Sequence, residues 1–230
     1  MNFNVKNINK KLYNKKINFI TIDGITCSGK TLFAKILKKK IKNSLLISKD
    51  IFLLPRLRRI KIIKSIKNKS LYFQNSLHYD LFKLKLLISF LINGNKNNKL
   101  VLNKLYNRKN GINNLRQTFY FNPNKIIIFE GIYSNENIKK IINPSIKILI
   151  TENVYTSLFR KIERIRDKKI SIQNVVTEFI KIHLSSYIKY LVQNSFDFIF
   201  TDLRKNFIIS KNGKNKQIKD IKKFLHKHQN

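Results

Sequence analysis

The segment from residue 17 to residue 35 constrains the fold of this chain more than any other. Its first part, Ile17 to Ile22, is apolar and rich in β-branched residues, which predicts a buried strand. A helix-like stretch begins at the end of the segment. Between the two lies the motif Gly24-Ile25-Thr26-Cys27-Ser28-Gly29-Lys30-Thr31. This is the G-x-x-x-x-G-K-[ST] phosphate loop in its required setting, with a strand before it and a helix after it.

Each residue type in the motif has a chemical reason. Gly24 and Gly29 let the backbone turn so tightly that its N–H groups point at phosphate oxygens. The helix that follows adds the positive end of its dipole to the same anion site. Lys30 supplies a positive charge for the terminal phosphates, and the hydroxyl of Thr31 suits Mg²⁺. We therefore expect residues 24–31 to bind a nucleoside triphosphate, taken as ATP, together with Mg²⁺.

The rest of the pattern predicts an α/β fold. The length of 230 residues suits one domain. Short apolar strands alternate with helices, which is typical of a parallel sheet covered on both faces. We expect strands at residues 17–22, 44–48, 125–129, 146–150, 196–200 and 207–209, a further short strand at 100–102, and a hairpin at 106–121. We expect helices at residues 32–41, 80–92, 155–166 and 172–192, a basic helix in 211–230, and an irregular surface segment at 53–70.

Two carboxylates follow strands of this expected sheet. Asp50 comes after the second strand, and Glu130 comes directly after the strand at 125–129. In a parallel sheet the ligand lies beyond the carboxyl ends of the strands, so Asp50, Glu130 and the phosphate loop should share one crevice. The chain has only 12 Asp and Glu residues, which makes this pair stand out.

The charge balance is extreme, with 48 Lys and Arg against 12 Asp and Glu and a net charge of +36. Such a charge can indicate a nucleic-acid or acidic-membrane partner. Lys, Asn and Ile are over-used along the whole length, however, as a very AT-rich coding sequence would produce, and no aromatic-interleaved basic stripe is present. We favour the compositional origin and expect no specific nucleic-acid partner.

Cysteine and hydropathy patterns indicate the compartment. Cys27 is the only cysteine, so no disulfide can form within the chain, and we expect a reducing compartment. No stretch of about 18 uncharged apolar residues predicts a membrane span. Residues 1–17 are basic but lack the continuous apolar core of a secretory signal. These features favour a cytoplasmic protein without a membrane partner. They do not decide between a monomer and a homo-oligomer.

The order of these segments resembles the uridine kinase and phosphoribulokinase family of P-loop kinases. The resemblance rests on the phosphate loop ending in GKT, on LLISKDIF at 45–52, on the hairpin, on IIIFEGIY at 126–133, and on an Arg-rich helix that runs into Arg166-Asp167. It spans about residues 17–205. It implies a P-loop kinase domain over residues 17–210, preceded by the basic extension 1–16 and followed by the basic helix 211–230.

The resemblance also implies roles for individual residues. Asp50 matches the residue that accepts the proton of the attacking hydroxyl and stays near the metal, and Glu130 matches the carboxylate that holds Mg²⁺ with Thr31. The segment 159–167 matches an Arg-rich lid over the transferring phosphate, and Tyr106 matches an aromatic residue that stacks on the acceptor. The expected catalytic residues are Asp50, Lys30, Arg160, Arg164 and Arg166; the expected acceptor-binding residues are Asp50, Gln74, Tyr106, Asn107 and Arg160.

The implied activity is an ATP-dependent phosphotransferase with an alcohol group as acceptor. A pyrimidine nucleoside, uridine or cytidine, is the first candidate for the acceptor. The chain departs from the uridine-specific pattern, because Gln74 stands where an Asp is usual and the hairpin lacks the usual Phe and His. A sugar phosphate or a vitamin precursor therefore stays open as acceptor. A non-enzymatic nucleotide-binding protein that binds nucleic acid is the alternative from another class.

Overall fold

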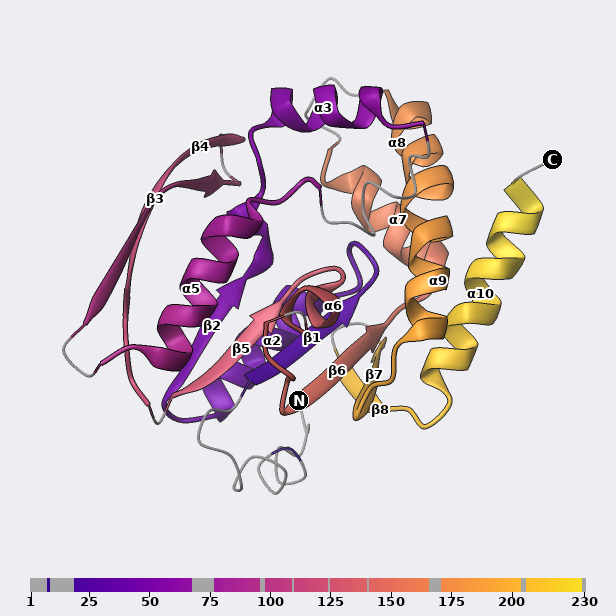
Figure 1. Cartoon of the computed structure of the whole chain (residues 1–230). Coiled ribbons are helices and arrows are strands. Elements are labelled where there is room, and N and C mark those ends of the chain that lie inside the picture. The colour runs from indigo at the N-terminus through magenta and orange to yellow at the C-terminus, as the bar shows by residue number, and fades with distance from the viewer. Residues whose placement is uncertain are drawn as a thin grey trace.

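A six-stranded sheet forms the centre of the computed structural model, which describes residues 8, 19–67, 77–95, 98–108, 110–123, 125–139, 141–165, 171–203 and 206–228. The strand order is β2-β5-β1-β6-β7-β8, and every neighbouring pair is parallel except β7 and β8. The bounds are β1 Phe19–Gly24, β2 Ser44–Ser48, β5 Ile126–Glu130, β6 Ile146–Thr151, β7 Phe198–Leu203 and β8 Asn206–Ile209. The sheet confirms the predicted P-loop α/β fold (Figure 1).

Helices surround the sheet (Figure 1). Their bounds are α2 Lys30–Lys40, α3 Arg56–Ser65, α5 Leu81–Asn93, α6 Ser134–Lys139, α7 Val154–Glu163, α8 Ile172–Glu178, α9 Ser185–Gln193 and α10 Gly213–His228. A 3₁₀ turn, η1, covers Lys49–Phe52, and a π-helical segment, η2, covers Phe179–Leu184 between α8 and α9. Among the described residues, no helix combines the length and the apolar composition needed to cross a membrane.

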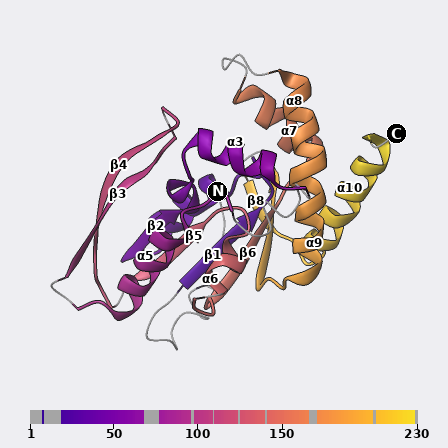
Figure 2. The same ribbon diagram turned by 45° about the horizontal axis from the view of Figure 1, so that its top comes forward.

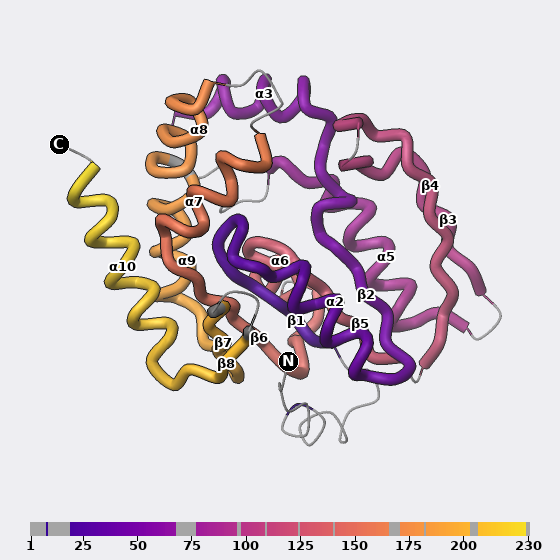
Figure 3. Tube along the Cα trace, turned by 180° about the vertical axis from the view of Figure 1, so that it is seen from behind, coloured from indigo at the N-terminus to yellow at the C-terminus, as the bar shows by residue number. Residues whose placement is uncertain are grey.

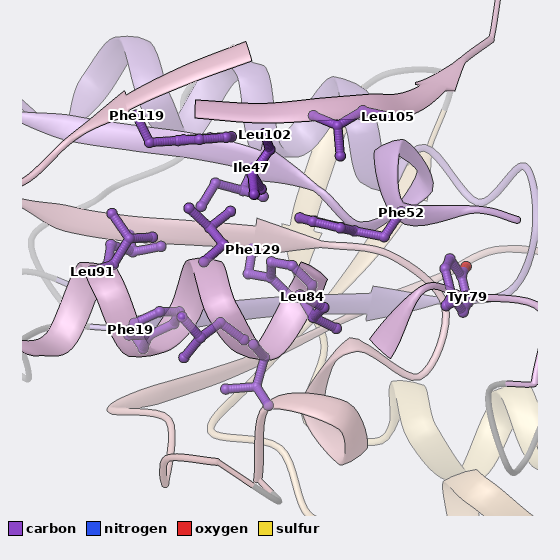
Figure 4. Packing of buried hydrophobic residues seen from close by; sticks show 14 residues of the cluster. Phe19, Ile47, Phe52, Tyr79, Leu84, Leu91, Leu102, Leu105, Phe119 and Phe129 are labelled. Atoms are coloured by element: carbon purple, nitrogen blue, oxygen red, sulfur yellow. The ribbon is translucent and has the colours of Figure 1, made fainter. Parts of the chain in front are cut away.

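Alternating residues of the central strands build cores on opposite faces of the sheet. In β1 and β5, Ile20, Ile22 and Ile128 belong to the core that contains Phe33 and Leu37 of α2. The intervening Phe19, Ile127 and Phe129 belong to the core beneath α5, which Figure 4 shows in close view. Figure 3, from behind, shows α2 lying across the sheet. Burial on both faces explains why these strands are apolar throughout.

A two-stranded antiparallel sheet lies outside α5. Its strands are β3 Lys99–Asn107 and β4 Ile112–Tyr120, and Gly111 turns the chain between them with a φ of 75°. This confirms the predicted hairpin and extends its first strand back to Lys99. Leu102, Leu105 and Phe119 attach the hairpin to the core beneath α5 (Figure 4).

Residues 56–65 form the helix α3, where the sequence predicts irregular structure. The prediction is wrong here because α3 has no buried residue and turns a mixed face, Arg56, Arg59, Ile60 and Ile63, toward one cavity. Arginines at these helically spaced positions hide the apolar period that would indicate a helix. Figures 1 and 2 show α3 spanning the space between the hairpin and α8.

Candidate active site

The phosphate loop has the backbone geometry that the motif predicts. Gly29, just before α2, adopts a φ of 90°, which a residue with a side chain rarely takes. A Cβ on Gly24 would lie 2.5 Å from the carbonyl oxygen of Ile150 and would also collide with the Ser28 hydroxyl. Gly29 is therefore required by its backbone conformation, and Gly24 is required by the close approach of neighbouring groups. The loop connects β1 to α2 at the carboxyl end of the sheet.

Lys30 lies inside this loop. Its side chain is buried, and its Nζ donates to the carbonyl oxygen of Ile25 at 2.6 Å. Burial lowers the pKa of the Lys30 ammonium, while the negative charges of Glu130 and Asp50 raise it. Lys30 lines one cavity together with both carboxylates that the sequence assigns to the site.

Glu130 ends β5 in contact with two hydroxyl groups. Thr31 Oγ1 donates to its Oε2 at 3.3 Å, and Ser48 Oγ donates to its Oε1. Burial raises the pKa of Glu130, and the charge of Asp50 raises it further. The hydroxyl and carboxylate oxygens that the sequence assigns to Mg²⁺ therefore lie next to each other. Ser48 was not predicted, although it precedes Asp50 by only two residues at the end of β2.

Asp50 lies in the 3₁₀ turn that follows β2 and pairs with a residue of the hairpin. Its Oδ2 is 3.0 Å from Nη1 of Arg108, and the two side chains are 29% and 53% exposed. Both line a cavity of about 120 Å³ together with Lys30, Thr31 and Glu130. This phosphate cavity brings together the loop and both carboxylates. The sequence does not predict the ion pair between Arg108 and Asp50. The one signal that could have indicated it is the scarcity of Arg in a Lys-rich chain.

The arginines expected in the lid take different places. Arg164 lines the phosphate cavity. Arg160 instead bridges two buried carboxylates, with its Nη1 2.8 Å from Glu152 Oε2 and 3.1 Å from Asp202 Oδ2. The same Nη1 donates to the carbonyl oxygen of Cys27 in the phosphate loop at 3.4 Å. Arg166 lies outside the described residues.

A second, larger cavity of about 400 Å³ adjoins the first, since Thr26, Asp50 and Ile132 line both. Its other walls come from α3, from His78 and Tyr79, and from the helices α8 and η2. We name it the acceptor cavity, because it is lined by Asp50, which the family resemblance assigns to the acceptor hydroxyl. Figure 2 shows α3 in front of the strand ends.

The described residues that were expected to bind the acceptor differ in their relation to this cavity. Asp50 lines it directly. Tyr106 is in contact with Arg59, one of its lining residues, and its hydroxyl accepts a hydrogen bond from Arg59 Nη2 at 3.2 Å. Asn107 ends β3, and its carbonyl oxygen accepts from Gly111 N. Gln74 lies outside the described residues.

The π-helical segment places two ionisable residues on one wall of the acceptor cavity. Glu178 and His183 are five residues apart, and the wider π turn brings their side chains to 3.0 Å. The hydrogen bond with His183 lowers the pKa of Glu178 to about 2, while burial lowers the pKa of His183. The sequence predicts one continuous helix here, and nothing in its pattern indicates the π segment.

Comparisons with known proteins identify the family and the fold. The family model of the phosphoribulokinase / uridine kinase family matches residues 19–208. Among solved structures, a possible uridine kinase from Bacillus stearothermophilus is 14% identical, with a TM-score of 0.58 over 84% of this chain and 93% of that chain. A D-glycerate 3-kinase from Cryptococcus neoformans var. grubii is also 14% identical, with a TM-score of 0.55 over 87% of this chain and 93% of that chain. No curated protein matches the sequence.

Proposed function

The chain belongs to the phosphoribulokinase and uridine kinase family, and from this premise we propose that it transfers the γ-phosphoryl group of ATP to a hydroxyl group of a small metabolite. The observation that carries the proposal is the position of Asp50 in the wall shared by the two cavities. A hydroxyl bound in the acceptor cavity could reach Asp50 on one side and the phosphates held by the loop on the other.

The transfer follows from these positions. The acceptor oxygen forms a bond to the γ-phosphorus, and the bond between that phosphorus and the β–γ bridging oxygen breaks. ADP leaves with the bonding electron pair, and the hydroxyl proton passes to Asp50. Lys30 and Arg164 neutralise charge on the phosphates, because both line the phosphate cavity. Such reactions depend on positioning and charge neutralisation more than on covalent chemistry.

The residues around Glu130 fit a magnesium ion. Mg²⁺ usually takes one or two protein carboxylates and completes its coordination with water and phosphate oxygens. Two oxygen ligands of this kind lie together here, because Thr31 Oγ1 is 3.3 Å from Glu130 Oε2. Thr31 and Glu130 would hold the ion, with Asp50 close by. When bound, Mg²⁺ supplies positive charge to the β- and γ-phosphates.

A coupled assay of ADP formation tests the proposal. Purified protein is mixed with ATP, Mg²⁺ and a panel of hydroxyl acceptors that includes uridine, cytidine, ribose 5-phosphate and D-glycerate. We expect acceptor-dependent ADP release that Asp50→Asn lowers by about 10²–10⁴-fold, the usual range for a general base. ATP binding should survive in the same variant. Equal ADP release from wild type and Asp50→Asn would refute the role of the carboxylate.

A further inference from the structure

Two arginines on one face of α3 give the acceptor cavity a positive wall. Arg56 and Arg59 are three residues apart, so they lie on the same side of the helix, and both line the cavity. Arginine is scarce in this Lys-rich chain. Arginine differs from lysine in its planar fork of donors, which matches carboxylate and phosphate groups.

Arg59 is held in place before any ligand binds. Its Nε donates to the carbonyl oxygen of Leu54 at 2.9 Å, and its Nη2 donates to the hydroxyl of Tyr106 at 3.2 Å. The guanidinium also lies over the Tyr106 ring, 5.2 Å from the centroid. These contacts fix the plane of the guanidinium, so an anion that binds to its remaining donors loses little side-chain freedom.

The carboxylates that line the acceptor cavity already have partners. Asp50 pairs with Arg108, and Glu178 accepts from His183 and lies 3.7 Å from Nζ of Lys161. Among the described residues, no carboxylate forms an ion pair with either of the two α3 arginines. A neutral acceptor would bring no negative charge to these arginines, whereas an anionic acceptor would complement their positive charge.

We propose that the acceptor carries an anionic group, a carboxylate or a phosphate, in addition to the hydroxyl that is phosphorylated. Arg59 binds this group with the help of Arg56, and the hydroxyl is presented to Asp50, which lines the same cavity. Tyr106 then acts as a positioning residue for Arg59 and does not stack on the acceptor. The inference rests on the proposed kinase function and specifies the class of its acceptor.

Matched acceptors and matched variants test this assignment. Ribose 5-phosphate is compared with ribose, D-glycerate with glycerol, and both anions with uridine. We expect turnover of an anionic acceptor, and Arg59→Gln should raise its KM by about 10- to 100-fold, the range for loss of charge-assisted hydrogen bonds. The KM for ATP should stay unchanged. Arg58→Gln is the control, because it removes the same charge from α3 at a residue outside the cavity lining.

The two anionic substrates distinguish a phosphate from a carboxylate as the bound group. Tyr106→Phe keeps the ring and removes only the hydroxyl that accepts from Arg59, so it should raise the KM of the anionic acceptor by about 2- to 10-fold. If Tyr106 instead stacks on the acceptor, Tyr106→Phe will behave like wild type. Uridine as the preferred substrate, with Arg59→Gln indistinguishable from Arg58→Gln, would overturn the proposal.

A binding measurement decides the question even if the true acceptor is absent from the panel. The phosphate loop is first filled with a non-hydrolysable ATP analogue, and inorganic phosphate is titrated by calorimetry. Wild type and Arg58→Gln should bind phosphate about 10- to 100-fold more tightly than Arg59→Gln. Equal affinities, or no binding to wild type, would refute the anion site. Failure of the kinase function would appear separately, as a protein that binds the analogue but phosphorylates nothing.

Discussion

Replacing Arg160 with alanine separates a structural role from a catalytic role for this arginine. The family resemblance places it over the transferring phosphate, whereas its Nη1 contacts Glu152, Asp202 and the carbonyl oxygen of Cys27. The side chains of Glu152 and Asp202 are only 6% and 2% exposed. Arg160→Ala therefore removes the cation that bridges two buried carboxylates.

The expected loss of stability follows from this burial. Removing one partner of a buried ion pair costs about 3–5 kcal/mol. In a domain of this size each kcal/mol lowers Tm by about 2–4 °C, so the variant should melt about 6–20 °C below wild type. The Arg160 side chain is 31% exposed, so we expect a value in the lower half of that range.

The loss should also depend on pH. Burial raises the pKa of Glu152, while the backbone N–H of Asn153 and the charge of Arg160 lower it. Without the arginine, the pKa of Glu152 in the folded state rises further. Between the unfolded-state pKa and this raised folded-state pKa, the folded variant binds more protons than the unfolded chain. Stability then falls as pH rises through the folded-state pKa. Arg160→Ala should accordingly lose more stability at pH 8 than at pH 5.

Thermal unfolding at both pH values, together with kcat, provides the assay. Arg160→Lys keeps a cation and should recover part of the lost Tm. Arg164→Ala is the matched control from the end of the same helix, because Arg164 lines the phosphate cavity. It should lower kcat and change Tm by less than about 2 °C. The opposite result would be an unchanged Tm for Arg160→Ala at both pH values together with a 100-fold loss of kcat. It would show that Arg160 acts on the phosphate, and the reasoning from its buried partners would be wrong.

Three further predictions concern the phosphate cavity and the charge of the chain. Lys30→Ala should keep less than about a tenth of wild-type kcat, a loss above roughly 1.4 kcal/mol, and more residual activity would refute its role. Asp50→Asn should lower kcat without changing the Kd of ATP, whereas Glu130→Gln should raise the Mg²⁺ concentration needed for activity. A magnesium titration with the opposite pattern would mean that the roles of the two carboxylates are reversed. Duplex DNA should bind only weakly, and its affinity should fall steeply with log[salt] in a filter-binding assay, as counterion release requires; sequence-selective binding near physiological salt would contradict the compositional origin of the +36 charge.

The sequence predicts the phosphate cavity well because its residues sit at positions that sheet topology controls. Glu130 ends β5 and Asp50 follows β2, and these strands are neighbours in the sheet. The carboxyl ends of parallel strands meet at one edge whatever the side chains around them are. Glycine requirements and strand periodicity also depend on local backbone geometry, which is why the phosphate loop can be identified from residues 24–31 alone.

The acceptor cavity could not be predicted in the same way, because side chains from distant segments make it. Arg59 becomes a candidate ligand only when α3 lies across the strand ends and Tyr106 of the hairpin reaches it. Glu178 and His183 meet only because the helix contains a π turn. Neither arrangement leaves a periodic signal in the sequence.

The phosphate cavity and the acceptor cavity therefore give different information about function. The phosphate cavity depends on backbone positions that a motif specifies, so it supports the class of reaction. The acceptor cavity depends on which side chains α3 contributes to its lining, so we expect these side chains to select the acceptor. A family match identifies the first of these and leaves the second to be argued from Arg56 and Arg59. We propose that the charge of Arg56 and Arg59 favours an anionic acceptor, and comparing Arg59→Gln with the Arg58→Gln control tests this preference.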